Sequence, residues 1–194
     1  MLFFIFFVTK REIMLLIIEN LRRGGRYSLN DNKDSMERIY MEYSKMVYKY
    51  LFSLTHNESI AEELMQETFY QAIRCQSRYD RSCKITTWLC AIAKNQWRNY
   101  CKKHHMEESL DQELIDKPVP SSEDIVLSNM NKMEIMKALH ELKDPQREVM
   151  YLRLSADLSF REIGEIMGQS ENWARVTYYR GKERLLKEVR NNGS

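Results

Sequence analysis

The chain has 194 residues, enough for one or two small domains, and its hydrophobic content of 43% suffices for packed cores and argues against a disordered chain. It contains only six glycines and three prolines beside many Glu, Lys, Leu and Met, a composition that favours helices with short connections. The net charge of +2 excludes no partner by itself, because residues 94–105 carry four bases and no acid whereas residues 107–124 carry seven acids and one base.

The first 35 residues differ from the rest of the chain. Residues 1–8 and 13–18 are almost wholly apolar, but neither run reaches the ~20 residues that a membrane-spanning helix needs, and charges separate them. Three interpretations stay open: a membrane-associating segment, a helix packed on the body, and a translated leader upstream of a true start at Met36. We favour the leader, which makes residues 1–35 an atypical N-terminal extension.

Two helices are predicted between residues 36 and 73. The first has apolar side chains at spacings of three and four, and residues 56–59 interrupt it. The second runs over about residues 60–73, with apolar or small residues on one face. Its other face carries Glu62, Glu63, Gln66 and Glu67. On pattern alone, such an acidic and amide-rich face is typical of a solvated surface.

A loop at residues 78–84 and a third helix, from about Thr86 to Lys103, come next. This helix interleaves aromatic, amide and basic side chains and has no acid. Cations track phosphates, amides read base edges and rings stack on unpaired bases, so the pattern suits a nucleic-acid strand. The alternative is that Trp88 and Trp97 belong to the core and the cations are solvated.

Four cysteines, at positions 75, 83, 90 and 101, form no C-x-x-C pair, and no secretory signal is visible. Reduced thiols in a cytosolic protein are therefore expected. Cys101 with His104 and His105 suggests a metal site, but a second ligand pair at zinc spacing is missing. We expect neither a metal nor a cofactor.

Residues 104–128 are predicted to be a flexible or extended acidic linker, since two prolines interrupt any helix there and apolar content is low. A second helical domain is predicted over residues 129–190. Its first helix is amphipathic. Asp144 and Pro145 then predict a helix start, with Asp144 as the cap and Pro145 at the first helical position.

The second domain ends in a helix-turn-helix pattern. Ser159 and Glu162 form a predicted capping box, and Gly168 is suited to end that helix in the left-handed conformation. Ser170 can cap a new helix two residues later. That helix is basic and aromatic, as a helix placed in the DNA major groove is. The pattern therefore predicts binding to double-stranded DNA.

The order of these parts resembles the bacterial extracytoplasmic-function (ECF) sigma factors of the sigma-70 family. Residues 61–69 are similar to the family's polymerase-binding helix, residues 87–95 to its promoter-melting helix, and residues 139–166 to its C-terminal DNA-binding domain. Residues 171–180 look closest to a Gram-positive branch of the SigV type. The resemblance runs from about Met36 to Val189.

The resemblance implies an all-α transcription initiation factor made of two small helical domains. Residues 36–103 would be sigma region 2, which binds core RNA polymerase and the −10 element, and residues 129–190 would be sigma region 4, which binds the −35 element. The acidic face would dock on the clamp helices of the polymerase β′ subunit, which replaces the solvated interpretation. The implied polymerase-binding residues are Glu62, Glu63, Gln66 and Glu67.

The resemblance also implies which residues bind promoter DNA. One base of the −10 element would be flipped into a pocket of the loop at residues 78–84, and holding it offsets the unstacking cost of about a few kcal/mol. The implied −10 residues are Arg78, Lys84, Trp88, Lys94, Asn95, Arg98 and Asn99. The implied −35 residues are Arg161, Ser170, Asn172, Arg175, Tyr179, Arg180 and Lys182.

Three positions depart from the family pattern. Gly164 and Gly181 stand where the family often has Ala, although a helical Gly costs about 1 kcal/mol relative to Ala. Gly164 is expected to permit closer helix packing, and the sequence gives no reason for Gly181. Cys90 replaces a common aromatic residue.

We therefore expect an alternative sigma factor and no enzyme, because the chain shows no paired acids, nucleophile–base arrangement or phosphate-cradling loop. The expected partners are core RNA polymerase, promoter DNA in double-stranded and melted form, and an anti-sigma factor of the kind that is often membrane-bound. No small-molecule substrate is expected, and the expected location is the cytoplasm. The alternatives are a helix-turn-helix regulator that acts without polymerase, and a membrane-tethered signalling protein that uses residues 1–18.

Overall fold

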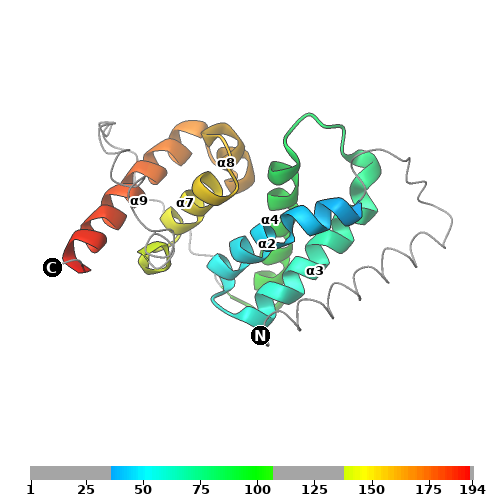
Figure 1. Cartoon of the computed structure of the whole chain (residues 1–194), viewed down its shortest axis with the longest axis horizontal. Coiled ribbons are helices and arrows are strands. Elements are labelled where there is room, and N and C mark those ends of the chain that lie inside the picture. The colour runs from blue at the N-terminus through cyan, green and yellow to red at the C-terminus, as the bar shows by residue number, and fades with distance from the viewer. Residues whose placement is uncertain (1–35, 107–137, 193–194) are drawn as a thin grey trace.

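The computed structural model of the chain describes residues 36–106 and 138–192, which contain helices and no strand (Figure 1). In chain order the elements are α2 (Met36–Thr55), α3 (Glu58–Cys75), the 3-10 turn η1 (Gln76–Arg78), α4 (Ile85–Lys103), α7 (Gln146–Ser155), α8 (Phe160–Met167) and α9 (Glu171–Asn192). The predicted N-terminal extension and nearly all of the predicted linker lie outside the described residues. Among the described helices, none is long and apolar enough to cross a membrane.

The first helical unit consists of α2, α3 and α4. As the spacing predicts, α2 buries one stripe, on which Val47, Tyr50 and Leu51 have no exposed surface. The predicted apolar face of α3 is buried as well. The helix break between them is capped locally, because Asn57 Oδ1 accepts a hydrogen bond from the backbone N–H of Ile60 at 3.1 Å.

The second helical unit consists of α7, α8 and α9, preceded by helical residues at 138–141. The capping box is confirmed: Ser159 Oγ accepts from the Glu162 N–H at 3.3 Å, and Glu162 Oε2 accepts from the Ser159 N–H at 2.8 Å. Gly168 ends α8 at φ +70°, and Ser170 Oγ accepts from the Trp173 N–H at 3.1 Å. The turn between α8 and α9 therefore has the predicted signals at both ends.

The predicted start of α7 needs a correction. The helix begins at Gln146, with Pro145 at the N-cap position and no capping bond from a side chain. The Asp144 carboxylate, which the pattern assigns to the cap, instead accepts from the Arg147 guanidinium at 2.8 Å. In this bond both the donor and the acceptor are charged, whereas a cap bond to a backbone N–H would have had a charged acceptor only.

Both departing glycines lie where another part of the chain comes close. A Cβ added to Gly164 would lie 2.8 Å from the backbone oxygen of Gln169, so the turn after α8 folds back directly onto that helix. A Cβ added to Gly181 would lie 2.9 Å from Met150 Cγ. The expected closer packing at Gly164 is thus observed, and Gly181 permits the close approach of α9 to α7.

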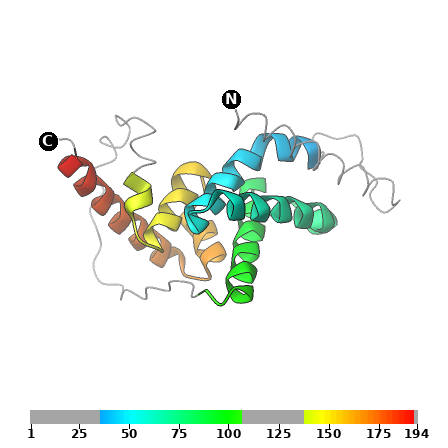
Figure 2. The same ribbon diagram turned by 90° about the horizontal axis from the view of Figure 1, so that it is seen from below.

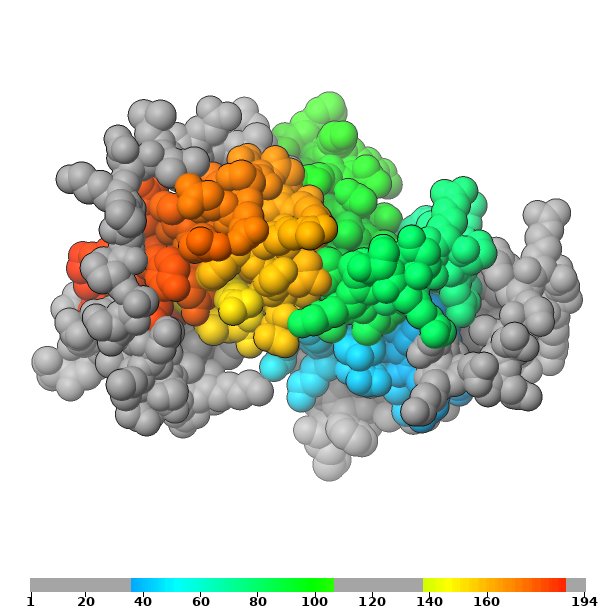
Figure 3. Space-filling model, turned by 90° about the horizontal axis from the view of Figure 1, so that it is seen from above, coloured from blue at the N-terminus to red at the C-terminus, as the bar shows by residue number. Residues whose placement is uncertain are grey.

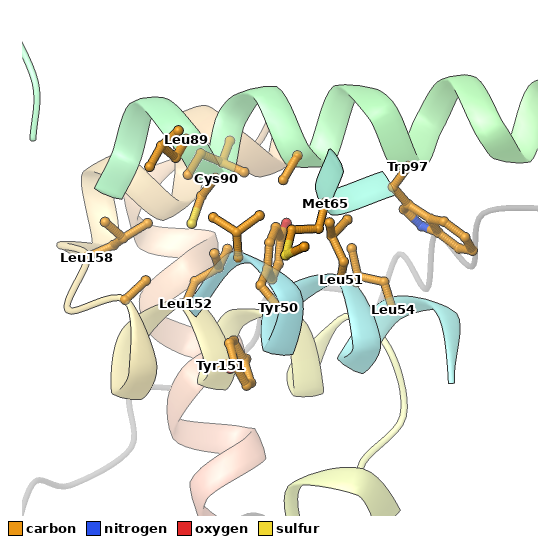
Figure 4. Packing of buried hydrophobic residues seen from close by; sticks show 14 of the residues in the cluster. Tyr50, Leu51, Leu54, Met65, Leu89, Cys90, Trp97, Tyr151, Leu152 and Leu158 are labelled. Carbon is orange, nitrogen blue, oxygen red and sulfur yellow. The ribbon is translucent and has the colours of Figure 1, made fainter. Parts of the chain in front are cut away.

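The two units pack against each other and share one hydrophobic core. Helix α2 contacts α7, and α4 contacts α8. Figure 4 shows side chains from α2, α4 and α7 pointing into the same space, among them Tyr50, Cys90 and Leu152. Figure 2 shows α8 beside α4 in a second view. The described structure is therefore a closed arrangement, in which the helix-turn-helix unit covers part of α4.

Candidate nucleic-acid interface

The acidic face of α3 is turned away from the core of its own unit. Glu63 is exposed, and Glu62, Gln66 and Glu67 are half-buried. Glu67 Oε1 accepts from Gln71 Nε2 at 2.7 Å, which orders the C-terminal part of the face. These side chains form an acid-rich surface along a single helix.

The loop after α3 is held by its own side chains. The rings of Tyr79 and Trp88 stack with centroids 4.8 Å apart, and the Tyr79 hydroxyl donates to the Cys83 carbonyl at 2.8 Å. The Asp80 carboxylate accepts from the Ser82 N–H at 2.9 Å, and this bond lowers the pKa of Asp80. The loop therefore carries Arg78 and Lys84, both exposed, on a locally ordered backbone.

A hollow of about 460 Å³ lies between this loop, the start of α4 and the N-terminal part of α2. Aromatic rings of Tyr43, Tyr79 and Trp88 line it, together with Arg38 and Arg81. The two tryptophans of α4 therefore have different environments, because Trp97 is 8% exposed in the core and Trp88 lines the hollow. Rings and cations around a hollow of this size suit a nucleic-acid base beside its phosphate.

The predicted −10 residues on α4 divide into two groups. Asn95 and Asn99 are exposed. Lys94 is 3% exposed, and its ammonium lies 3.0 Å from Glu148 Oε2 of α7. The Arg98 guanidinium donates to the Met167 carbonyl at 3.4 Å, at the end of α8. Lys94 and Arg98 therefore contact the helix-turn-helix unit in this arrangement.

Glu148 is the centre of a buried polar group between the two units. Its Oε1 accepts from the Tyr50 hydroxyl at 2.6 Å, and its Oε2 accepts from Lys94 Nζ at 3.0 Å. Burial, and then the Glu148 charge, raises the pKa of Tyr50 well above its usual value, so the phenol stays a donor. We call Tyr50, Lys94 and Glu148 the interdomain triad.

The predicted −35 residues lie on α8, on the turn and on α9. Arg161, Ser170, Asn172 and Arg175 are exposed. Arg175 lies 2.6 Å from Glu171 and 5.8 Å from the centroid of the Phe160 ring, so its stem is held along α9. These four side chains are therefore accessible on α8, on the turn and at the start of α9.

The remaining −35 residues are less accessible. Tyr179 packs near Phe160, with ring centroids 6.3 Å apart, and Arg180 is half-buried. Lys182 is only 3% exposed. The first two turns of α9 therefore offer the accessible groups, whereas Lys182, further along that helix, is buried.

Two family models match the chain in order. Sigma-70 region 2 matches residues 39–106, and Sigma-70 region 4 matches residues 132–185. The ECF RNA polymerase sigma factor SigM of Bacillus subtilis (strain 168) is 32% identical over 78% of this chain and 93% of SigM. The chain belongs to the ECF sigma factors of the sigma-70 family. As a sigma factor, it serves promoter-specific initiation of transcription.

Other relatives agree with this assignment. The RNA polymerase sigma factor YlaC of the same bacterium is 30% identical over 81% of this chain and 94% of YlaC, and SigV is 24% identical over 72% of this chain and 81% of SigV. The sigma factor RpoE of Bartonella quintana, solved in complex with the anti-sigma factor NepR, superposes with a TM-score of 0.57 at 19% identity, covering 79% of this chain and 96% of RpoE. That likeness shows the fold.

In this sigma factor the region 2 match covers α3, α4 and all but the first three residues of α2, and α7 to α9 begin within the region 4 match. Sequence reasoning missed Tyr50 and Glu148 as polar contacts between the regions. Tyr50 lies on an apolar stripe and is counted as core, and Glu148 lies next to a buried segment, 149–152. An acid beside a buried apolar run is the only local signal that was available for Glu148.

Proposed function

We propose that this sigma factor binds core RNA polymerase through the acidic face of α3 and holds the −10 element with the loop and α4 of region 2. The outward part of the helix-turn-helix then reads the −35 element. The observation that carries the proposal is the hollow lined by Trp88 and Tyr79, next to an exposed acidic face on the preceding helix. One surface suits a protein partner and the other suits an unpaired base.

The −10 element would enter the sigma factor at this hollow. A flipped base stacks on the ring of Trp88 or Tyr79, while Arg78 and Arg81 lie near its phosphates. Base–aromatic stacking is worth about 1–3 kcal/mol per base, which is comparable to the cost of taking one base out of the helix. Asn95 and Asn99 continue the strand contact along the exposed side of α4.

The −35 element would be contacted from the N-terminal turns of α9. Arg175 and Asn172 reach base edges, and Ser170 and Arg161 contact the backbone. A bidentate contact between Arg175 and a guanine gives about 1–3 kcal/mol of discrimination against another base. Tyr179, Arg180 and Lys182 would contribute from deeper positions on the same helix.

The assignment implies further properties of the protein. The sigma factor would have no catalytic activity of its own, bind no small-molecule substrate and act in the cytoplasm. Its domains would follow the predicted bounds, 36–103 for region 2 and 129–190 for region 4, with residues 104–128 as the linker. An anti-sigma factor would be a partner, a proposal supported by two similar structures: RpoE with NepR, and CnrH with the cytosolic domain of CnrY.

The test is transcription with purified core polymerase. Wild-type protein is expected to give promoter-specific run-off transcripts, and Glu63→Lys is expected to lose both these transcripts and co-elution with the core enzyme. Glu141→Lys is the matched control, since it reverses an exposed acid in the other unit, and it should keep co-elution. If Glu63→Lys binds the core enzyme as the wild type does, the docking face is elsewhere.

The same experiment separates the alternative of an operator-binding regulator. Such a protein would bind a specific duplex tightly in the absence of polymerase and would leave the transcripts of core polymerase unchanged. Promoter-specific transcripts that depend on the added chain would exclude it.

A further inference from the structure

A small cavity lies where the two helical units meet. The units pack over a broad surface, and Figure 3 shows the yellow and orange residues of region 4 directly against the green residues of α4. A cavity of about 30 Å³ lies at the contact of α2 with region 4. Its walls include Lys49 and Phe52 of α2, Leu139 and His140 of the helical residues before α7, and Arg147 and Tyr151 of α7. None of these residues is among those expected to bind promoter DNA or polymerase, so the proposed function leaves the cavity unexplained.

The charged groups around this cavity have one sign. Lys49 and Arg147 contribute permanent cations, and His140 contributes an imidazole that becomes a cation when it is protonated. No Asp or Glu belongs to the described lining of the cavity. Asp144 pairs with the Arg147 guanidinium at 2.8 Å but lies outside this lining. The cavity is therefore surrounded by donors and positive charge and has no carboxylate of its own.

Arg147 is buried with one donor left over. The residue is 8% exposed, and its two terminal nitrogens donate to the Leu142 carbonyl at 2.9 Å and to the Asp144 carboxylate at 2.8 Å. The third nitrogen, Nε, is buried and has no hydrogen-bond partner. A buried donor without an acceptor is costly, and in a native protein it indicates a bound water or ion. The cavity beside Arg147 is the place where such an acceptor fits.

A neighbouring histidine reports the electrostatic field at this corner. The rings of His56 and His140 have centroids 5.7 Å apart. Burial, and then the charges of Arg147 and His140, lower the pKa of His56, although Asp144 acts in the opposite direction. The Phe52 ring packs edge-on against His140 at 5.5 Å and limits the access of water. Positive charge therefore prevails here even with Asp144 nearby, and an apolar wall weakens the screening of that charge.

We propose that this cavity binds one small inorganic anion, which accepts from the Arg147 Nε–H and lies near Lys49 and His140. A water molecule needs about 10–15 Å³ of such a cavity, so the volume of about 30 Å³ admits a chloride ion or one oxygen of a phosphate. Water would satisfy the donor, but only an anion also compensates the cations, and a hydrogen bond to an ion is the stronger one. A bound anion stabilises the folded chain by linkage, because the unfolded chain has no such site.

The first test is urea unfolding of the full chain in different salts. Potassium chloride, potassium phosphate and potassium gluconate are compared at equal ionic strength, and gluconate is too large for the cavity. Each tenfold rise in chloride above the dissociation constant should raise the ratio of folded to unfolded chains by up to about tenfold, whereas gluconate should not. A larger effect of phosphate than of chloride would assign the site to an oxyanion.

Two variants separate the site from general salt effects, which act on every variant alike. Lys49→Gln removes one cation of the lining and should lose most of the difference between chloride and gluconate. Lys45→Gln removes an exposed cation from the same helix, one turn earlier, and should keep that difference. Arg147→Lys keeps a cation but removes the Nε donor, and it should also lose the difference. If Arg147→Lys fails to fold, Lys49→Gln against Lys45→Gln still decides.

The line width of the chloride NMR signal gives a direct second readout. Exchange of chloride into the site should broaden the signal with wild-type protein and with Lys45→Gln, and much less with Lys49→Gln. The proposal is overturned if chloride, phosphate and gluconate stabilise the wild type equally, or if Lys49→Gln and Lys45→Gln respond alike in both readouts. The cavity then holds water only. Neither measurement involves DNA or polymerase, so both are independent of the proposed function.

Discussion

Gly164 and Gly181 both lack a Cβ at a point of close contact, but the neighbouring atoms differ between the two positions. At Gly164 the nearest atoms to an added Cβ are backbone atoms of Gln169 and Ser170, which cannot move without changing the turn. At Gly181 the nearest atoms belong to the flexible side chain of Met150. The same substitution should therefore have different effects at the two positions.

We expect Gly164→Ala to lower the free energy of unfolding by about 1–3 kcal/mol, because overpacking against backbone outweighs the gain in helix propensity. Gly181→Ala is the matched control and should change it by less than about 1 kcal/mol, since Met150 can adopt another rotamer. Urea unfolding followed by circular dichroism measures both. Equal losses at the two sites would contradict this explanation of Gly164.

The four cysteines differ in accessibility. Cys90 is fully buried, with its thiol 3.8 Å from Met46 Sδ, and burial raises the pKa of Cys90 to about 12. Cys101 is 4% exposed, whereas Cys75 and Cys83 are half-buried. Cys90 therefore fills the core behind α4 and does not line the hollow at Trp88.

We expect iodoacetamide at about pH 8 to modify Cys75 and Cys83 in the folded protein and to leave Cys90 and Cys101 unmodified, because the thiolate is the reacting form and must be reached by the reagent. Mass spectrometry of tryptic peptides counts the sites. In denaturant all four should react. Modification of Cys90 in the folded protein as fast as that of Cys75 would mean that the interface between the units is often open.

At the scale of elements, Glu162 both caps α8 and accepts a hydrogen bond from α4. Glu162 accepts from Ser159 within the cap and from Thr87 Oγ1 of α4 at 2.6 Å. Burial acts to raise the pKa of Glu162, but the bonds from Thr87 and Ser159 and the charge of Lys84 outweigh it and lower the pKa below its ordinary value of 4.5. The ionised form is thus preferred by the folded state.

The pH dependence follows from the sign of that shift. A carboxyl whose pKa is lowered by folding contributes stability above its ordinary pKa of 4.5, and the contribution is lost as pH falls through the folded value. Glu162→Gln should therefore be less stable than the wild type by about 1 kcal/mol near neutral pH, and the difference should shrink below that pKa. Denaturant titrations across acid pH measure it, with Glu165→Gln on the exposed side of α8 as control. A difference that is constant with pH would contradict the role of the charge.

Local signals predicted the elements well where the partner of each group is a near neighbour in sequence. Ser159, Gly168 and Ser170 behave as predicted because their capping bonds involve residues at most four positions away. Asp144 was wrong as a cap because Arg147, another near neighbour, binds the same carboxylate. Both the Arg147 guanidinium and the backbone N–H groups at the start of α7 are local donors for the Asp144 carboxylate. The guanidinium is also held by the Leu142 carbonyl, to which it donates at 2.9 Å.

At the scale of the whole molecule, the sequence could not predict which distant side chains would meet. The basic and aromatic character of α4 is visible in the pattern, but Lys94 and Glu148 are 54 positions apart. Their pairing depends on how two units dock, which no helical period encodes. Asn95 and Arg175 are accessible, and their predicted DNA contacts remain proposals. Lys94 and Lys182 are buried, which the composition of the chain does not reveal.

Thermal unfolding of the triad variants tests how the two units share stability. Glu148→Leu or Lys94→Met alone should destabilise the closed molecule, by up to about 3–5 kcal/mol if the interface cannot separate and by less if it can, because separation hydrates the remaining charge. The double variant Lys94→Met with Glu148→Leu should recover most of the loss. Calorimetry of the four proteins gives the coupling between positions 94 and 148. Additive losses would mean that the two side chains act independently.

The backbone contact at Gly164 has a mechanical consequence. Because the turn after α8 folds back onto that helix, with a further cap at Ser170, α8 and α9 cannot swing freely about the joint between them. If the helix-turn-helix separates from α4, we expect it to move as a single rigid unit. Under the proposed function, the angle at which α9 meets a DNA groove would therefore be set before any promoter is bound, and a substitution that loosens this joint would change which duplexes the protein prefers without altering any contact to a base.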